Sequence, residues 1–212
     1  SDLAGFSLSP AGDFNADGLP DLLIGAFGAD PNGPESGRAY IVYGSDAGFS
    51  SPLELSALNG TNGVILNGPS VDERAGVVVA GISDINNDGI DDVAITANLI
   101  TPAFRSYVVY GAAAGLLSPF ELSALDGSNG FAIEDSSGTL RFAVRSAGDF
   151  NADGFSDLAR VATGANFNGV DSGRVYVLFG PTSGFPAVLD LASLDASNAL
   201  VIDGENSDDG LG

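Results

Sequence analysis

Acidic residues recur at a fixed spacing in three loops, and their side-chain oxygens could bind a metal ion. Each loop has the pattern D-x-N-x-D-G-x-x-D, in which positions 1, 3 and 5 carry oxygen-bearing side chains. The glycine at position 6 permits a sharp turn, position 7 can offer its carbonyl, and we expect the aspartate at position 9 to close the shell. The expected ligands in the successive loops are Asp13, Asn15, Asp17, Leu19 and Asp21; Asp84, Asn86, Asp88, Ile90 and Asp92; and Asp149, Asn151, Asp153, Phe155 and Asp157.

This set of oxygen ligands favours calcium. Three carboxylates, an amide, a carbonyl and water supply the roughly six to eight oxygens that Ca²⁺ prefers, whereas Mg²⁺ demands tighter octahedral geometry. An EF-hand is excluded, because position 12 holds Ile24, Ile95 or Arg160 where that motif needs a bidentate glutamate. The alternative is a set of Asx-rich turns without metal. Three carboxylates in so short a loop would repel one another without a cation, so we expect three Ca²⁺ sites, one per repeat.

The charge balance excludes several classes of partner. The chain has 28 acidic and 7 basic residues and a net charge of −21. Nucleic acids and anionic membranes require a basic face, so neither is expected to bind. No apolar run approaches the roughly 20 residues of a membrane span, so we expect no membrane insertion. Without Cys or His, the chain can form no disulfide, thiolate zinc site or His-based catalytic triad.

The acidic loops belong to a unit that is repeated three times, at intervals of roughly 70 residues. The motifs SGRAYIVYG, FRSYVVYG and SGRVYVLFG follow the loops, and LELSAL, FELSAL and LDLASL come next. We place the units at residues 1–68, 69–135 and 136–207, with 208–212 starting a fourth repeat. Because the chain begins at Ser1, we interpret it as an excised or processed piece.

Each unit is predicted to contain four short β-strands, separated by clusters of Gly, Pro, Asn and Asp. In the first unit the strand-like runs are GFSLS before the acidic loop, then residues 22–26, 39–43 and 64–66. The LELSAL-type segments permit either a helical turn or an extended connection. Four strands per repeat are typical of a β-propeller blade. The predicted fold class is therefore all-β, with three four-stranded blades that form a partial propeller or half of a six-bladed ring.

Three blades would leave apolar surface at both ends of the arc, and such a surface calls for a neighbour. Propellers typically close with four to eight blades. Three arrangements stay open at this point: two copies close a six-bladed ring, the natural polypeptide continues with more blades, or copies stack into a larger assembly.

The stretch DFNADGLPDLLIGA followed by GRAYIVYG resembles the FG-GAP repeat of integrin α-subunit propellers and related bacterial extracellular proteins. The resemblance covers essentially the whole chain, in three copies. It implies that the acidic loop joins the first two strands of each blade and binds Ca²⁺. It also implies adhesion and ligand binding rather than catalysis.

The third unit contains three arginines that have no basic counterpart in the other units. They are Arg141, Arg145 and Arg160. Arg141 and Arg145 would share a strand face, with Arg160 across the hairpin, so the three could grip a carboxylate or sulfate on a partner. The alternative is pairing within the protein, for instance with Glu134 or Asp135. Another arginine precedes a tyrosine by two residues in every repeat, and we expect it to pair with a nearby carboxylate.

Catalysis by the acidic residues is not expected. A glycosidase-type pair needs two carboxyls in different environments within one cleft, whereas most aspartates here belong to repeated loops. We expect an extracellular or cell-surface, calcium-binding propeller segment for adhesion or assembly, whose partner is a protein, a glycan or another copy of the chain. The alternatives are a self-assembling subunit of an extracellular filament or sheath, and a non-catalytic appendage of a larger secreted enzyme or toxin.

Overall fold

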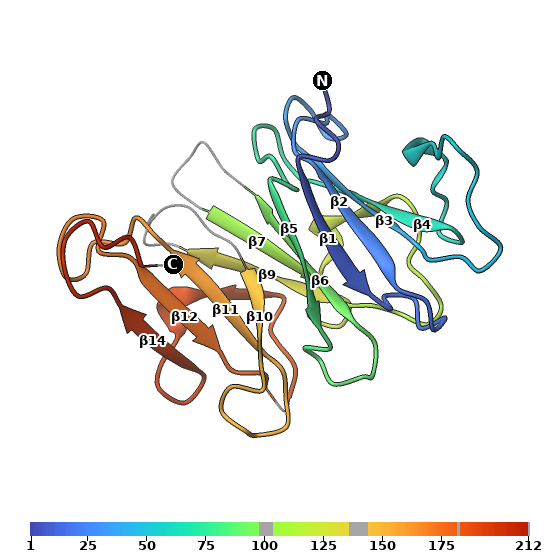
Figure 1. Ribbon diagram of the computed structural model, residues 1–212. Helices are drawn as coiled ribbons and strands as arrows, with labels where there is room; N and C mark the ends of the chain where they lie inside the picture. The colour runs from blue at the N-terminus through green and yellow to red at the C-terminus, as the bar shows by residue number, and fades with distance from the viewer. Residues whose placement is uncertain (98–103, 136–143, 182, 212) are drawn as a thin grey trace.

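The computed structural model describes residues 1–97, 104–135, 144–181 and 183–211. Its regular structure within these ranges consists of β-strands and three short 3-10 helices. The strands form three separate sheets that lie side by side (Figure 1). The predicted all-β fold of propeller blades is therefore confirmed. No helix in the described ranges is long and apolar enough to cross a membrane.

The first sheet, called blade 1, is an antiparallel meander of four strands with a fifth, parallel strand at its outer edge. The meander consists of β1 (Ser7–Gly12), β2 (Asp21–Ala26), β3 (Arg38–Val42) and β4 (Gly63–Asn67), and the fifth strand is β8 (Phe120–Glu121). Because β8 comes from the second repeat, the following repeat completes the edge of blade 1.

Blade 2 repeats this arrangement, whereas blade 3 has, within the described residues, the four-stranded meander alone. Blade 2 contains β5 (Val78–Ser83), β6 (Asp92–Ala97), β7 (Phe104–Val109) and β9 (Gly130–Asp135), with β13 (Val188–Asp190) parallel to β9. Blade 3 contains β10 (Val144–Gly148), β11 (Asp157–Ala162), β12 (Arg174–Leu178) and β14 (Ala199–Asp203).

The LELSAL-type segments combine the two conformations that the sequence allows. In the second and third repeats a short strand, β8 or β13, leads directly into a 3-10 turn. The turns are η1 (Leu55–Ala57), η2 (Leu122–Ala124) and η3 (Leu191–Ser193). The register is conserved between the two joints, since Phe120 lies opposite Leu66 and Leu189 lies opposite Ile133.

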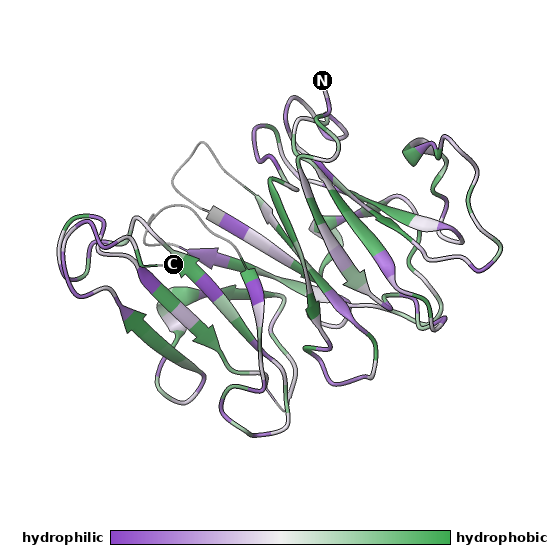
Figure 2. Ribbon diagram, in the orientation of Figure 1, coloured by the Kyte–Doolittle hydropathy of each residue, from purple (hydrophilic) through white to green (hydrophobic). Residues whose placement is uncertain are grey.

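Apolar side chains fill the two spaces between adjacent blades. Leu23 and Ile41 of blade 1 are fully buried in one cluster with Val93 of blade 2. In the second cluster, Phe131 of blade 2 stacks on Phe185 of the third repeat, with ring centroids 4.2 Å apart. Figure 2 shows hydrophobic colour concentrated along the strands and hydrophilic colour in the loops that join them. The blades are therefore held together by burial of their faces.

Close approach between blades depends on a missing side chain at one point on β2. A Cβ added to Gly25 would lie 2.1 Å from the carbonyl oxygen of Gly76 in the next repeat. Any larger residue would force the two blades apart. This glycine therefore positions blade 1 against blade 2.

Candidate metal centre

The three acidic loops occupy equivalent positions, each joining the first two strands of its blade. Position 1 of each loop follows the first strand, and the aspartate at position 9 is the first residue of the second strand. The strand pairing shifts register at the same place in every blade, just before the loop. The hairpin therefore presents the loop at one end of the sheet, as the sequence indicates.

In the first loop, side-chain oxygens accept hydrogen bonds from backbone N–H groups of the same loop. Asp13 accepts hydrogen bonds from the N–H of Asp17 and of Gly18, both at 2.9 Å. Asn15 Oδ1 accepts from the Asp17 N–H at 3.2 Å, and Asp17 Oδ1 accepts from the Leu19 N–H at 2.8 Å. Each bond uses one lone pair of an oxygen, so acceptor capacity remains on the same atoms for a cation.

The other two loops repeat this geometry. Asp84 Oδ2 accepts from Gly89 N–H at 2.8 Å, and Asp149 Oδ2 accepts from Gly154 N–H at 3.0 Å. The position-6 glycines have φ values of +87°, +90° and +93°, in the left-handed region that favours glycine. The predicted role of this glycine in a sharp turn is therefore visible in all three repeats.

The residue at position 4 has a positive φ in every loop. Ala16, Asn87 and Ala152 have φ values of 57°, 60° and 61°. A single alanine in this region costs on the order of 1–2 kcal/mol. Asn87 adopts this region more readily, because asparagine tolerates it. In the two loops with alanine, the conformation is therefore imposed by the surrounding hydrogen bonds rather than by local preference.

The aspartate at position 9 has a role that the sequence did not reveal. Asp92 is fully buried, and its carboxylate accepts the N–H of Ile85 at 2.9 Å and of Gly111 at 2.8 Å. Burial raises the pKa of Asp92 to about 7, while these two hydrogen bonds oppose the rise and the charges of Asp88 and Asp84 add to it. The carboxylate thus ties the start of the loop to the end of the third strand.

Equivalent clamps are present in the other blades. Asp21 accepts from Phe14 N–H and Gly44 N–H, at 2.9 and 2.8 Å, and burial also raises its pKa. Asp157 accepts from Gly180 N–H at 2.9 Å and from Phe150 N–H at 2.8 Å. The sequence does contain a signal for this clamp, because the position-9 aspartate and the glycine that ends each YG or FG motif recur together in every repeat. That glycine has no room for a Cβ in any blade.

The sequence predicts three carboxylates among the ligands of each loop. Within the ranges that the structure describes, no three acidic side chains gather in a way that could hold a metal ion. Positions 1 and 5 supply carboxylates, position 3 supplies an amide, and the position-9 carboxylate faces backbone N–H groups. Each loop thus offers carboxylate and amide oxygens, which are the ligand types that hard cations take in proteins.

The structure describes two of the three arginines that the sequence singles out in the third repeat, Arg145 and Arg160, and it does not bring these two together. Val144 lies opposite Arg160 and Arg145 opposite Ala159, so Arg145 and Arg160 point to opposite faces of the sheet. Arg145 is exposed, whereas Arg160 is fully buried. Burial lowers the pKa of Arg160 to about 10, and the nearby charge of Asp135 opposes this. Arg141 lies outside the described residues. The described pair thus favours the alternative of pairing within the protein for Arg160.

The arginine that precedes a tyrosine in each repeat pairs across the two outer strands. Arg105 forms an ion pair with Glu134, and Arg174 forms one with Asp203. In blade 1 the equivalent acceptor is an amide, since Arg38 Nε donates to Asn67 Oδ1 at 2.7 Å. The expected carboxylate partner is therefore present in two blades and replaced by asparagine in the first.

A known family of repeats matches two of the three units that carry these loops. The FG-GAP repeat family model matches residues 4–42 and 146–178. These ranges contain the acidic loops of blades 1 and 3. The chain contains FG-GAP repeats. The family that the sequence resembles is thereby confirmed.

Proteins similar to this FG-GAP chain include integrin α-subunits and a phospholipase. Mouse integrin alpha-IIb is 33% identical over 165 residues, which is 73% of this chain, and Xenopus laevis integrin alpha-5 is 31% identical over 80% of it. Rat phosphatidylinositol-glycan-specific phospholipase D is 38% identical over 112 residues, or 50% of the chain. The matched segments span only 13–16% of the length of these relatives.

Proposed function

We propose that this chain is a non-catalytic, calcium-binding array of FG-GAP blades that mediates adhesion or protein–protein assembly outside the cell. The observation that carries this proposal is that one loop geometry occurs three times. In each loop the aspartate at position 1 accepts a hydrogen bond from the N–H of the glycine at position 6. A fold alone does not define a function, so the loops carry the argument.

Calcium would be held by the exposed end of each loop. In the first loop the ligands are the side chains of Asp13, Asn15 and Asp17 and the carbonyl of Leu19, with Asp21 holding the loop from below. The proposed ligands of the other loops are Asp84, Asn86, Asp88 and Ile90, and Asp149, Asn151, Asp153 and Phe155. A bound cation would neutralise neighbouring carboxylates and cross-link the loop, which stabilises the folded blade.

The proposed partners are proteins or glycans rather than small substrates. The acidic residues are distributed over three equivalent loops, which does not provide the single pair of unlike carboxyls that acid–base hydrolysis needs. The acidic composition, with a net charge of −21, suits a calcium-rich extracellular medium. Two relatives are named as integrins, which supports a role in adhesion.

A second candidate function is that of a non-catalytic appendage of a larger secreted enzyme. The rat relative is named as a phospholipase D, and the match covers 13% of its length. In this arrangement the repeats would form a binding module, and a separate part of the same protein would carry the catalytic residues.

Calcium uptake by the chelator-stripped chain tests the proposal. We expect three equivalents per chain by equilibrium dialysis, with Kd on the order of 10⁻⁴–10⁻³ M. A calcium concentration ten times the Kd would add about 1.4 kcal/mol of stability per site. The double variant Asp13→Ala/Asp17→Ala should bind two equivalents instead of three.

The matched control is Asp46→Ala, which removes an exposed carboxylate outside the loops. It should bind three equivalents, like the unchanged chain. Absence of uptake by the unchanged chain, or unaltered uptake by the loop variant, would disprove the calcium sites. Thermal melting with and without calcium measures the added stability, and sucrose in place of calcium controls for general stabilisation.

A further inference from the structure

The turn that leads into β4 contains the only Asn-x-Thr or Asn-x-Ser sequence of the chain. It consists of Asn59, Gly60 and Thr61. This is the sequence that N-glycosylating enzymes modify, provided that the middle residue is not proline and the site lies at the surface. Such a short motif also arises by chance, so its meaning depends on what the turn does with these side chains.

Side-chain oxygens hold the turn together. Asn59 Oδ1 accepts hydrogen bonds from the Thr61 N–H at 3.0 Å and from the Thr61 hydroxyl at 2.7 Å. Asn62 Oδ1 accepts from the Asn59 N–H at 3.0 Å, and the Gly60 N–H donates to the Gly63 carbonyl at 2.8 Å. The turn therefore uses the oxygen of the Asn59 side chain and the hydroxyl of Thr61.

The second and third repeats build the same turn with an aspartate in place of Asn59. Asp126 Oδ1 accepts from the N–H and the hydroxyl of Ser128, at 2.9 and 2.7 Å. Asp195 Oδ1 accepts from the N–H and the hydroxyl of Ser197, at 2.8 and 2.5 Å. A single side-chain oxygen thus makes the same two bonds in all three repeats.

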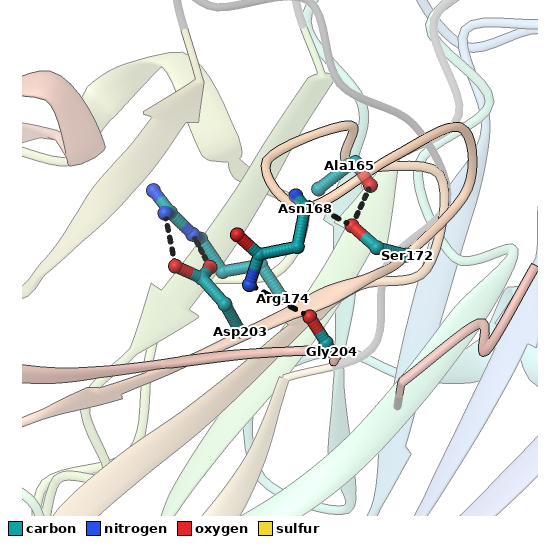
Figure 3. A network of polar contacts seen from close by, with 6 residues as sticks. All are labelled: Ala165, Asn168, Ser172, Arg174, Asp203 and Gly204. Atoms are coloured by element: carbon teal, nitrogen blue, oxygen red, sulfur yellow. Dashed lines mark hydrogen bonds and ion pairs between the residues drawn. The ribbon is translucent and has the colours of Figure 1, made fainter. Parts of the chain in front are cut away.

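The side-chain nitrogen of Asn59 is the part that the turn does not use. Asn59 Nδ2 donates no hydrogen bond to any residue that the structure describes. Other asparagines do use this atom: Nδ2 of Asn62 donates to the Ala57 carbonyl at 3.3 Å, and Nδ2 of Asn168 donates to the Gly204 carbonyl at 2.9 Å (Figure 3). Because aspartate makes the same turn in the other repeats, the fold does not require an amide at Asn59.

The turn is exposed with or without a neighbouring blade. Asn59 and Thr61 are exposed, and so is Asp126 in blade 2, which has a blade on either side. A Cβ added to Gly60 would lie 3.0 Å from the Leu116 carbonyl oxygen, so the second repeat already packs against the turn of the first. The Asn59 side chain therefore stays accessible beside a complete joint.

We propose that Asn59 accepts an N-linked glycan. In the transfer step Asn59 Nδ2 forms a bond to C1 of the first sugar of an oligosaccharide carried on a polyprenyl diphosphate. The bond from C1 to the diphosphate oxygen breaks, and the polyprenyl diphosphate leaves with that electron pair. Nδ2 loses one proton to a base of the transferase. The inference rests on the extracellular location proposed above, since secreted chains are the ones that meet this donor.

Secretion of the full chain from an N-glycosylating eukaryotic cell line tests the proposal. Mass spectrometry of the secreted chain should show a glycan on at least half of the molecules, with Asn59 as the modified residue. Peptide-N-glycosidase should remove the glycan and leave aspartate at this position. Thr61→Ser should keep the glycan, whereas Thr61→Ala should lower its occupancy at least tenfold, because the hydroxyl is part of the recognised sequence.

The matched control is Asn59→Asp, which installs the residue that the other repeats use in this turn. It should carry no glycan and keep the fold. After removal of the glycan from the unchanged chain, the two Tm values should agree within about 2 °C. Asp126→Asn is the reverse change, because it gives the second repeat an Asn-x-Ser sequence in the same turn. It should add a second glycan, and Asp126→Asn combined with Ser128→Ala should not.

Three results would overturn the proposal. They are a folded, secreted chain without a glycan, a glycan that persists in Asn59→Asp, and an Asp126→Asn chain that stays unmodified at the new site. The last result would show that this turn does not present an acceptor. Circular dichroism checks that each variant is folded.

Calcium uptake by the same secreted chains separates this inference from the proposed function. Asn59→Asp and Asp126→Asn both lie outside the acidic loops, so each variant should bind three equivalents. A glycosylated chain that takes up no calcium would contradict the calcium sites alone. A chain that takes up calcium but carries no glycan would contradict the assignment of Asn59 alone.

Discussion

At the scale of single residues, one aspartate per blade links the acidic loop to the sheet. Asp92 accepts two backbone N–H groups within the protein interior. The exposed aspartates of the same loop, such as Asp88, satisfy N–H groups that water can also reach. The two kinds of aspartate, four residues apart, therefore differ in what their removal costs.

Asp92→Ala should lower the free energy of unfolding by about 2–5 kcal/mol, because two buried N–H donors lose their acceptor. Chemical denaturation in the presence of a chelator measures this loss without a contribution from calcium. Asp88→Ala is the control, and should change stability by less than about 1 kcal/mol under the same conditions. Equal stabilities of the two variants would contradict the assignment of Asp92 as a clamp.

Among single residues, the sequence predicted turns well but predicted poorly which face of a sheet a side chain lies on. The spacing of the loop residues predicted the turn and its glycine, because these depend on neighbours in the chain. The predicted grouping of Arg145 with Arg160 depends on strand register. Val144 pairs with Arg160, and the register shifts between Ser146 and Gly148, which no local pattern indicates.

At the scale of elements, the short fifth strands join one repeat to the next. Glu121 of β8 accepts from Asn67 Nδ2 and from Asn32 Nδ2, both at 2.7 Å. All of this bonding is between repeats. Glu54 holds the equivalent position in the first repeat, where the described residues show no such side-chain bond.

Glu121→Ala should therefore destabilise the joint between blades 1 and 2 by about 1.5–3 kcal/mol, the cost of losing hydrogen bonds to a charged group. Thermal or chemical unfolding measures the change, and amide exchange should show β4 opening more readily. Glu54→Ala, which removes an exposed carboxylate, should change stability by no more than about 0.5 kcal/mol. A loss as large as that of Glu121→Ala would refute the role given to the fifth strand.

Most of the meander could be predicted from the sequence, whereas the fifth strands could not. The apolar runs at 22–26, 39–43 and 64–66 correspond to β2, β3 and β4 because they are bounded by turn residues. In contrast, β8 has two residues, and it pairs with a strand more than 50 residues earlier. Its extended conformation is determined by the neighbouring blade rather than by its own composition.

At the scale of the whole molecule, the net charge of −21 opposes compaction. Three bound calcium ions would reduce it to −15. The ion pairs formed by Arg74, Arg105 and Arg174 offset the repulsion only locally. Salt should therefore substitute in part for calcium.

Raising the ionic strength of the calcium-free chain should increase its stability by about 1 kcal/mol, or roughly 2–4 °C in Tm. Scanning calorimetry in low and moderate NaCl measures the shift, and KCl should have the same effect because the screening is not specific. Unchanged or lower Tm in both salts would show that repulsion does not limit stability.

The offset between repeat and blade has a consequence for synthesis on the ribosome. The last strand of blade 1 ends at Asn67, but the strand that covers its edge ends at Glu121. Blade 1 thus cannot be completed until much of the second repeat has left the exit tunnel. Blade 2 likewise cannot be completed before β13, which ends at Asp190, has been synthesised. The growing chain always carries one unfinished edge at its newest blade, so folding proceeds from the N-terminus in steps that lag behind translation.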